Sequence, residues 1–201
     1  MQLNVNGIRS RKIELDHRLA TDKPHIVCLQ ETKLKPNMSA PRFAGYNTAA
    51  RQDRSLDSPG GGVIILVRDD MSYEPITNPY CASNSDPYTD CTAIKIHPLK
   101  IPPFTVINLY SPPPRWIQDQ TPQLQRLDIT ALKTFPRMII TADLNAHGSW
   151  DPHQPSDQLG SLIDDWSSDN NLFILNNGSH TRINPATGAN PPQMLQFPHL
   201  I

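Results

Sequence analysis

Long apolar runs and cysteines are scarce in this sequence of 201 residues. No run approaches the ~18 apolar residues of a membrane span. No apolar signal region precedes the first predicted strand, so we expect a protein of the nucleus or cytoplasm that is not secreted. The three cysteines, Cys28, Cys81 and Cys91, show no CxxC or Cys/His metal spacing. They favour a reducing compartment, and a Cys81–Cys91 disulfide is the alternative for a secreted protein.

An excess of positive charge is also absent, because 18 Lys and Arg stand against 19 Asp and Glu for a net charge of −1. Proteins that bind duplex nucleic acid by displacing counterions normally carry a basic face. Any such face must be local in this chain, and a solvated charged surface is the alternative interpretation. The candidates are Arg9, Arg11, Lys12, Lys33, Lys35, Arg51 and Arg54.

Proline is abundant instead. The 21 prolines are about 10% of the chain, roughly twice the usual share, and they cluster between the apolar runs as loop residues. The 37% of hydrophobic residues can supply one core in a chain of this length. We therefore expect a single α/β domain over residues 1–201.

The hydrophobic pattern alternates between strand-like and helix-like segments. Short apolar or alternating runs predict strands at 3–6, 26–29, 43–50, 63–67, 92–97, 104–110, 138–142 and 172–175. Apolar residues at helical spacing predict helices at about 11–21, 117–134 and 161–169. We find no internal repeat, and the alternation favours an α/β sheet core.

Acidic side chains stand at the ends of two predicted strands. Glu31 closely follows the strand 26–29, and Asp143 directly follows the strand 138–142. Mg²⁺ prefers hard oxygen ligands and usually takes only one or two protein carboxylates, leaving the rest of its shell to water and substrate phosphate. The pair therefore predicts a metal-dependent site that cleaves phosphodiester bonds.

A glycine triplet at 60–62 precedes another predicted strand. A phosphate-binding P-loop would lead into a helix and would carry Gly-Lys-Ser/Thr, and neither feature is present. Close packing of the backbone is the preferred interpretation of the three glycines.

Five short motifs follow one another along the chain: NVNGIR at 4–9, LQETK at 29–33, GGGV at 60–63, NLYSP at 108–112 and DLNAH at 143–147. In this order they resemble the endonuclease/exonuclease/phosphatase superfamily. Trp150 after the last motif, and the later Thr181-Arg182, point within it to the apurinic-type endonuclease domain of non-LTR retrotransposons. The resemblance covers about residues 3–182.

The resemblance implies a four-layer α/β sandwich of two mixed sheets flanked by helices, with the active site at one end. It implies a DNA endonuclease that depends on Mg²⁺, or on Mn²⁺, and nicks target DNA to prime reverse transcription. DNA is the implied partner, a reverse-transcriptase domain is expected in a full-length parent, and neither a membrane nor an obligate protein partner is expected.

The resemblance also implies roles for six residues. Glu31 and Asn4 are expected at the metal. Asp143 would orient or deprotonate the attacking water, Asn145 would hydrogen-bond the phosphate, and Tyr110 would donate its hydroxyl to a phosphate oxygen. Asn6 would support the site, although the family often has Asp at that position. His147 either assists the site or braces its loop, and bracing is the favoured interpretation.

The sequence departs from the family pattern after Arg182. The family ends with an Ile-Asp strand and a Ser-Asp-His motif, and residues 184–201 contain neither. His199 lies too close to Arg182 and lacks the neighbouring Asp. We therefore expect a domain that is incomplete at its C-terminus and lacks its last strands. Abasic-site repair or phosphatase activity, and an inactive remnant that only binds metal or nucleic acid, are the alternatives.

The missing His–Asp pair predicts little or no nicking by the chain, because one such donor contributes roughly 10²–10³ in rate. The measurement is conversion of supercoiled plasmid to the nicked form in Mg²⁺. Rapid conversion that Asp143→Ala abolishes would contradict the prediction.

Overall fold

A computed structural model describes residues 1–55, 60–80, 88–113 and 127–176. The chain forms two compact units, one of Gln2–Asn145 and one that begins at Ala146 and includes Met1. The first unit contains both sheets and all six predicted site residues. The single domain predicted for residues 1–201 stays a prediction. Thr181, Arg182, His199 and Cys81 lie outside the described residues.

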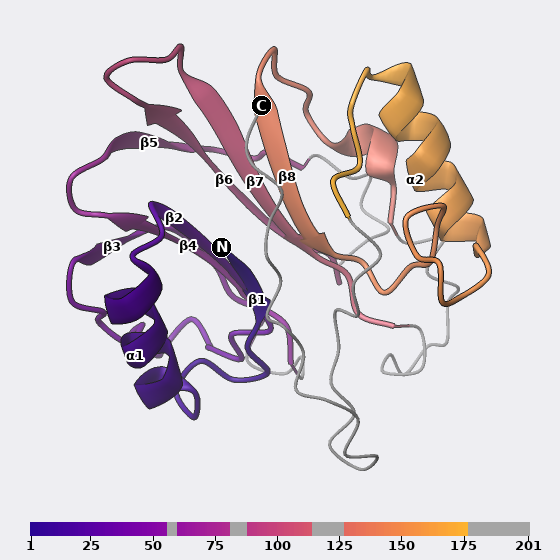
Figure 1. Cartoon of the computed structure of the whole chain (residues 1–201). Helices are drawn as coiled ribbons and strands as arrows, with labels where there is room; N and C mark the ends of the chain where they lie inside the picture. Colours follow the sequence, from indigo (N-terminus) through magenta and orange to yellow (C-terminus); the bar gives the residue numbers. More distant parts are fainter. Residues whose placement is uncertain (56–59, 81–87, 114–126, 177–201) are drawn as a thin grey trace. The chain divides into compact units, whose positions relative to one another are not determined.

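The first sheet has four strands in the order β1-β2-β4-β3 (Figure 1). Its strands are β1 (Gln2–Asn4), β2 (Ile26–Gln30), β3 (Tyr46–Gln52) and β4 (Val63–Arg68). β1 pairs parallel to β2, and the other neighbours are antiparallel. Helix α1 (Lys12–Asp22) connects β1 to β2, as a parallel pair requires, and it buries Leu15 and Leu19.

The second sheet has the order β5-β6-β7-β8. Its strands are β5 (Ser72–Ile76), β6 (Asp90–His97), β7 (Phe104–Tyr110) and β8 (Met138–Asp143). β7 and β8 are parallel, and the other pairs are antiparallel. Each sheet therefore ends in one parallel pair, and both sheets are mixed as predicted.

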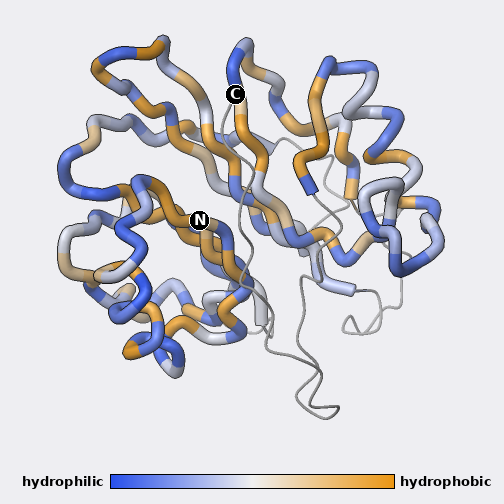
Figure 2. The backbone as a smooth tube through the Cα atoms, viewed as in Figure 1, coloured by the Kyte–Doolittle hydropathy of each residue, from blue (hydrophilic) through white to orange (hydrophobic). Residues whose placement is uncertain are grey.

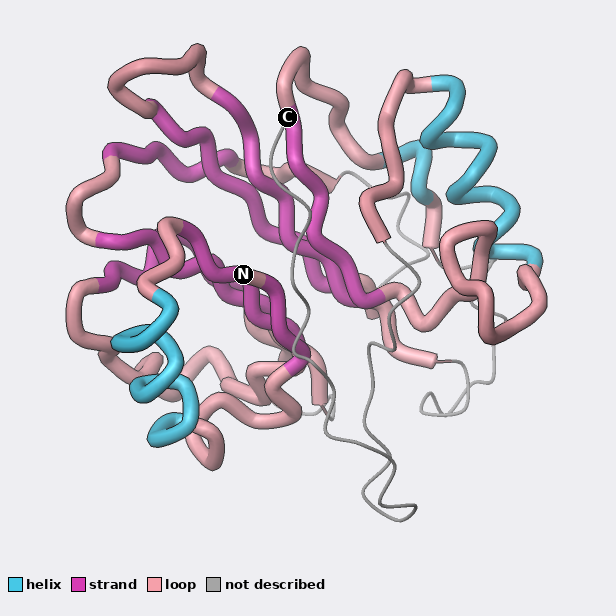
Figure 3. The backbone as a smooth tube through the Cα atoms, viewed as in Figure 1, coloured by secondary structure: helices cyan, strands magenta, loops and turns pink. Residues whose placement is uncertain are grey.

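The two sheets pack face to face over an apolar core. The core cluster takes Cys28, Ala49, Ile65 and Val67 from the first sheet and Ile94, Ile96 and Val106 from the second. Figure 2 shows apolar residues gathered along the strands of both sheets. Strand is the main regular structure, with two α-helices in the described part of the chain (Figure 3). The architecture is the α/β sandwich that the resemblance implied.

The inner face of the second sheet changes from apolar to polar along its strands. Register places three rows of neighbouring side chains on that face: Ile94, Val106 and Ile139; then Thr92, Asn108 and Thr141; then Asp90, Tyr110 and Asp143. The apolar row belongs to the core, and the last row carries two carboxylates and a phenol. The interior between the sheets is therefore apolar at one end and polar at the other, and the predicted site residues lie at the polar end.

Asn108 links the two sheets at the boundary between these regions. Its side chain is fully buried and donates to the main-chain oxygens of Leu29 and Ile64, at 3.0 Å each. Its oxygen accepts from Gln30 Nε2 at 2.6 Å and from Thr141 Oγ1 at 3.3 Å. Buried amides require such partners, so this contact fixes one sheet on the other.

The second compact unit contains helix α2 (Gln158–Asp169). Asp157 caps its first turn by accepting from the Gly160 N–H, as an N-cap aspartate does. Among the described residues no helix is long and apolar enough to cross a membrane.

Most predicted elements match within a few residues, with three exceptions. β5 was not predicted, because its short sequence with Pro75 lacks a strand-like apolar run. Residues 172–175 were predicted as a strand but form none. The helix predicted at 117–134 is wrong over residues 127–134, where the structure has only the 3₁₀ turn η3 (Ile129–Ala131); residues 117–126 are not described.

Asn108→Ala is expected to lower the free energy of unfolding by about 2–3 kcal/mol, because it leaves buried polar groups in both sheets without partners. Urea denaturation followed by circular dichroism measures the change. Asn47→Ala is the matched control, since Asn47 is an exposed β3 residue bonded to Asp69. Equal effects of the two substitutions would contradict the cross-sheet role.

Candidate active site

The backbone at the end of β2 carries Glu31 into the site. Main-chain bonds continue past the strands, with the Gly7 N–H donating to Glu31 O at 2.8 Å. Glu31 has a φ of 51°, and Asn6 has a φ of 45°. These left-handed conformations are uncommon for residues other than glycine, and such strain gathers at functional sites.

The Asn4 side chain joins two carboxylates. Its Nδ2 donates to Glu31 Oε1 at 2.8 Å and to Asp143 Oδ2 at 2.7 Å. Its Oδ1 accepts from the Asn6 N–H at 3.1 Å. Glu31 follows β2 of the first sheet and Asp143 ends β8 of the second, so Asn4 holds together acids from two sheets. The structure brings these four predicted residues together.

Glu31 is the most buried acid of this group, with 6% of its surface exposed. Its Oε2 is buried and has no hydrogen-bond partner in the described structure. A buried carboxylate oxygen without a donor is costly, and a bound cation would satisfy it. Asp143 is only half-buried and Asn4 is exposed, so this pair of acids is open to solvent on one side.

Tyr110 lies beside these acids, at 1% exposure. It is the strand neighbour of Asp143 in the register of β7 and β8. Burial, followed by the charge of Glu31 and a hydrogen bond with the Glu31 carboxylate, raises the pKa of the Tyr110 phenol above its ordinary value, and Arg54 opposes the rise. The hydroxyl therefore stays protonated at neutral pH and is a hydrogen-bond donor.

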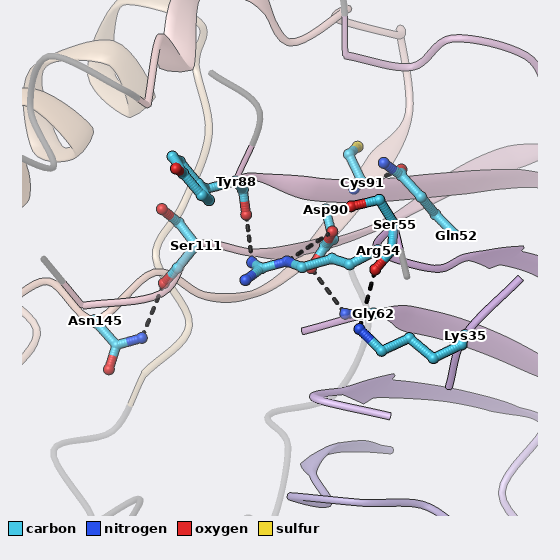
Figure 4. A network of polar contacts seen from close by, with 10 residues as sticks. All are labelled: Lys35, Gln52, Arg54, Ser55, Gly62, Tyr88, Asp90, Cys91, Ser111 and Asn145. Atoms are coloured by element: carbon cyan, nitrogen blue, oxygen red, sulfur yellow. Dashed lines mark hydrogen bonds and ion pairs between the residues drawn. The ribbon is translucent and has the colours of Figure 1, made fainter. Parts of the chain in front are cut away.

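Asn145 lies just past β8 and is exposed, with a φ of 50°. Its Nδ2 donates to the Ser111 main-chain oxygen at 2.9 Å (Figure 4). Ser111 directly follows Tyr110, and its N–H donates to the Asp143 oxygen at 3.0 Å. The main chain of Ser111, just after β7, therefore holds both Asn145 and Asp143 in place.

A buried ion pair lies on the other side of Tyr110. Arg54 Nε donates to Asp90 Oδ2 at 3.0 Å, and the Arg54 guanidinium also donates to the Tyr88 main-chain oxygen (Figure 4). Asp90 Oδ2 further accepts from the Gly62 N–H at 2.8 Å. The Arg54 guanidinium carbon is 5.4 Å from the centre of the Tyr110 ring, which is cation–π distance.

The glycine triplet makes room for this pair. A Cβ on Gly61 would collide with the Arg54 side chain, and a Cβ on Gly62 would lie 2.5 Å from Thr32 Oγ1. Gly60 has open space around it. All three have positive φ. Close backbone packing, as predicted, is the reason for Gly61 and Gly62, whereas Gly60 is favoured only by its positive φ.

The basic residues that were predicted as a nucleic-acid-binding face differ in burial and in hydrogen bonding. Arg54 is buried, which removes it from any exposed face. Arg9 donates to Ser39 O, while Arg51 donates to Lys35 O and to Met38 O, so both arginines hold the loop that follows Thr32. Lys33 is exposed beside Glu31. The structure therefore leaves less basic surface than the sequence suggested.

The two described cysteines are buried thiols. Cys28 and Cys91 are free, and the alternative Cys81–Cys91 disulfide is thereby wrong for Cys91. Burial, with a smaller contribution from Asp90, raises the pKa of Cys91 to about 12, and burial also raises the pKa of Cys28. Both thiols are therefore protonated and inert at neutral pH.

The oxygens at this end of the sandwich fit a hard divalent cation. Glu31 offers an unpartnered oxygen, and Asp143 lies across the Asn4 amide from it. The described residues contain no group of three or more His, Cys, Asp and Glu that could hold a metal. Two carboxylates with open solvent beside them suit Mg²⁺, which keeps several waters.

His147 lies in the second compact unit. Its Nδ1 is 2.8 Å from Asp151 Oδ2, and its main-chain N–H and oxygen both bond to Asp157, the cap of α2. These contacts support the bracing interpretation of His147.

Sequence reasoning did not find the roles of Arg54 and Asp90. Arg54 was counted as a surface cation, and Asp90 was not singled out. The available signal was the glycine triplet, since three successive glycines without a P-loop indicate that a large side chain passes close to the backbone.

Comparison with known proteins gives a family match and several similar folds. The model of the Endonuclease/Exonuclease/phosphatase family matches residues 1–195. The endonuclease domain of TRAS1, a telomere-specific non-LTR retrotransposon, has 21% identity and a TM-score of 0.62, over 87% of this chain and 73% of that one. No curated protein matches the chain.

Two further structures share the fold. The AP endonuclease LMAP from Leishmania major has 16% identity and a TM-score of 0.51, over 77% of this chain and 57% of that one. The Xenopus laevis APE2 catalytic domain has 21% identity and a TM-score of 0.51, over 80% of this chain and 63% of that one. At these identities the likeness concerns the fold.

Gly61→Ala is expected to destabilise the protein more than Gly60→Ala. Both positions have nearly equal positive φ, of 65° and 66°, so the backbone strain is the same. Only the Gly61 Cβ collides with Arg54. We expect an additional loss of about 1–3 kcal/mol for Gly61→Ala, measured by urea denaturation. Equal losses would show that Arg54 does not pass against Gly61.

Proposed function

The chain belongs to the endonuclease/exonuclease/phosphatase family, and we propose that it is the Mg²⁺-dependent endonuclease domain of a retroelement, which nicks DNA to prime reverse transcription. The family and the similar folds indicate hydrolysis of phosphate esters in general. The metal, the DNA substrate and the priming role are the proposal. In a full-length parent we expect a reverse-transcriptase domain.

The observation that carries the proposal is the pairing of Glu31 and Asp143 through one amide, with Glu31 Oε2 buried and unpartnered. Two carboxylates that share one amide donor lie close enough to repel each other. A divalent cation removes that repulsion and satisfies the open oxygen. Asn4 can reach the same ion through Oδ1 if its amide turns over, an exchange that the structure of a side-chain amide permits.

In this proposal Glu31 and Asn4 hold the ion. When bound, Mg²⁺ or Mn²⁺ supplies positive charge to a phosphate oxygen. Asp143 lies on the open side, where its carboxylate can accept a proton from a water aligned with the phosphorus. The buried Tyr110 hydroxyl donates to a phosphate oxygen as negative charge develops there.

Two asparagines complete the proposed site. Asn145 would hydrogen-bond the phosphate, and its bond to the Ser111 main-chain oxygen keeps it at the end of β7 and β8. Asn6 stands beside Asn4 on an exposed turn and supports substrate contacts. A neutral Asn6 adds no third negative charge to Glu31 and Asp143.

DNA is proposed as substrate because the TRAS1 retrotransposon endonuclease domain shares the fold. The AP endonuclease LMAP shares it as well, so repair of abasic sites is the second candidate. An assay with intact supercoiled plasmid and an abasic duplex in parallel separates them. Cleavage of the abasic duplex alone would favour repair, and cleavage of neither would favour a remnant that only binds.

Glu31→Gln is expected to change stability in opposite directions with and without metal. In EDTA the substitution removes a buried negative charge next to Asp143, one oxygen of which has no hydrogen-bond donor, so the thermal midpoint should rise. In millimolar Mg²⁺ the wild-type midpoint should rise through binding to the folded state, whereas the variant midpoint should not move. Scanning calorimetry measures all four midpoints.

Glu74→Gln is the control for this prediction, because Glu74 is an exposed acid on β5 that pairs with Lys95. It should leave the Mg²⁺ response intact. A Mg²⁺ response of the same size in Glu31→Gln would rule out Glu31 as the ligand.

A further inference from the structure

Arg54 is a buried cation that forms an ion pair with a buried acid, Asp90. Its exposed fraction is 7%, and that of Asp90 is 2%. Nε lies 3.3 Å from Asp90 Oδ1 and 3.0 Å from Oδ2, and the guanidinium also reaches the Tyr88 oxygen. Asp90 starts β6 and is the strand neighbour of Tyr110, so the ion pair is attached to the same row as the phenol.

The Arg54 guanidinium also lies over the Tyr110 ring. Its edge is used for hydrogen bonds, and its carbon lies 5.4 Å from the Tyr110 ring centre. Gly61 leaves the space that Arg54 occupies, and Gly62 supplies a second donor to Asp90. Four segments distant in sequence thus converge to hold one cation against one ring.

We propose that Arg54 is the positioning residue of Tyr110, holding the ring so that its hydroxyl points to the Glu31 and Asp143 side of the site. The proposal rests on the proposed function, in which that hydroxyl donates to the phosphate. The cation lies 5.4 Å from the Tyr110 ring centre, and the hydroxyl has a hydrogen bond with Glu31, so the ring and the hydroxyl each have a charged neighbour before substrate binds.

A purely structural role is the competing interpretation, because Arg54 and Asp90 also join the loop after β3 to β6. The two roles differ in their coupling to the Tyr110 hydroxyl. A positioning residue loses its effect once the hydroxyl is absent, whereas a structural clamp reduces activity by the same factor in either background.

The test uses a charge-neutral change, since Arg54→Met alone would leave Asp90 buried and unpaired. The variants of the whole chain are Arg54→Met with Asp90→Asn, Tyr110→Phe, and all three substitutions together. The matched control is Arg68→Met with Asp70→Asn, which removes an ion pair of 2.7 Å at the far end of β4. Thermal unfolding confirms that each variant folds before it is assayed.

The first readout is the rate of plasmid nicking in Mg²⁺. We expect Tyr110→Phe and the Arg54/Asp90 change each to slow nicking about tenfold or more, and the triple variant to be no slower than Tyr110→Phe within about twofold. Arg54→Lys, which keeps a cation beside the ring, should recover part of the rate. Fold-losses that multiply in the triple variant would overturn the proposal.

The second readout does not depend on activity. Tyrosine labelled with ¹³C at Cζ gives one resonance for each of the five tyrosines, and Tyr110→Phe assigns that of Tyr110. The Arg54/Asp90 change should shift or broaden the Tyr110 resonance, and the Arg68/Asp70 control should not. An unmoved Tyr110 resonance would overturn the proposal. If the wild-type chain nicks too slowly for its variants to be compared, as the missing His–Asp pair predicts, the resonance alone decides the positioning of Tyr110. Failure of the proposed function shows separately, as a wild-type thermal midpoint that Mg²⁺ does not raise.

Discussion

Two carboxylates of like charge, Glu31 and Asp143, have to be held together where two sheets end, and one neutral amide lies between them. Asn4 gives one N–H to each acid, whereas a carboxylate at position 4 would add a third negative charge. The strands that carry these residues must therefore be placed precisely. The parallel pairs β1–β2 and β7–β8 bring the three strand ends to one edge.

Two buried polar groups at this end of the sandwich are fully paired and stabilise it. Asn108 bonds to both sheets, and Arg54 is neutralised by Asp90. Because this ion pair is neutral, Arg54 does not cancel the charge of Glu31 and Asp143. Glu31 Oε2 is left without a donor, and a demand for positive charge remains at the site. The Asn108 bonds and the Arg54–Asp90 ion pair stabilise the fold around the site. The fold can therefore tolerate one acid with an unsatisfied oxygen where metal-dependent chemistry is proposed.

Particular elements show how far sequence reasoning reached. The strand at 104–110 was predicted with the bounds that the structure has, because its apolar run ends at a clear proline loop. The family and the sandwich predicted from five motifs are confirmed. The segment 172–175 has a strand-like composition, yet a strand also needs a partner for its main-chain bonds, and no described segment pairs with it. β5 was not predicted from the hydrophobic pattern, because edge strands tolerate proline and polar residues.

The sequence by itself determined the periodicity of the elements, the acids at two strand ends and the order of motifs that marks the family, because these are local properties of the chain. Only the tertiary structure decided that Asn4 bridges residues 27 and 139 positions away. It also decided that Arg54 lies buried against Tyr110 and contributes nothing to a basic surface. Such contacts depend on how two sheets pack, and side-chain spacing along one chain carries no record of that geometry.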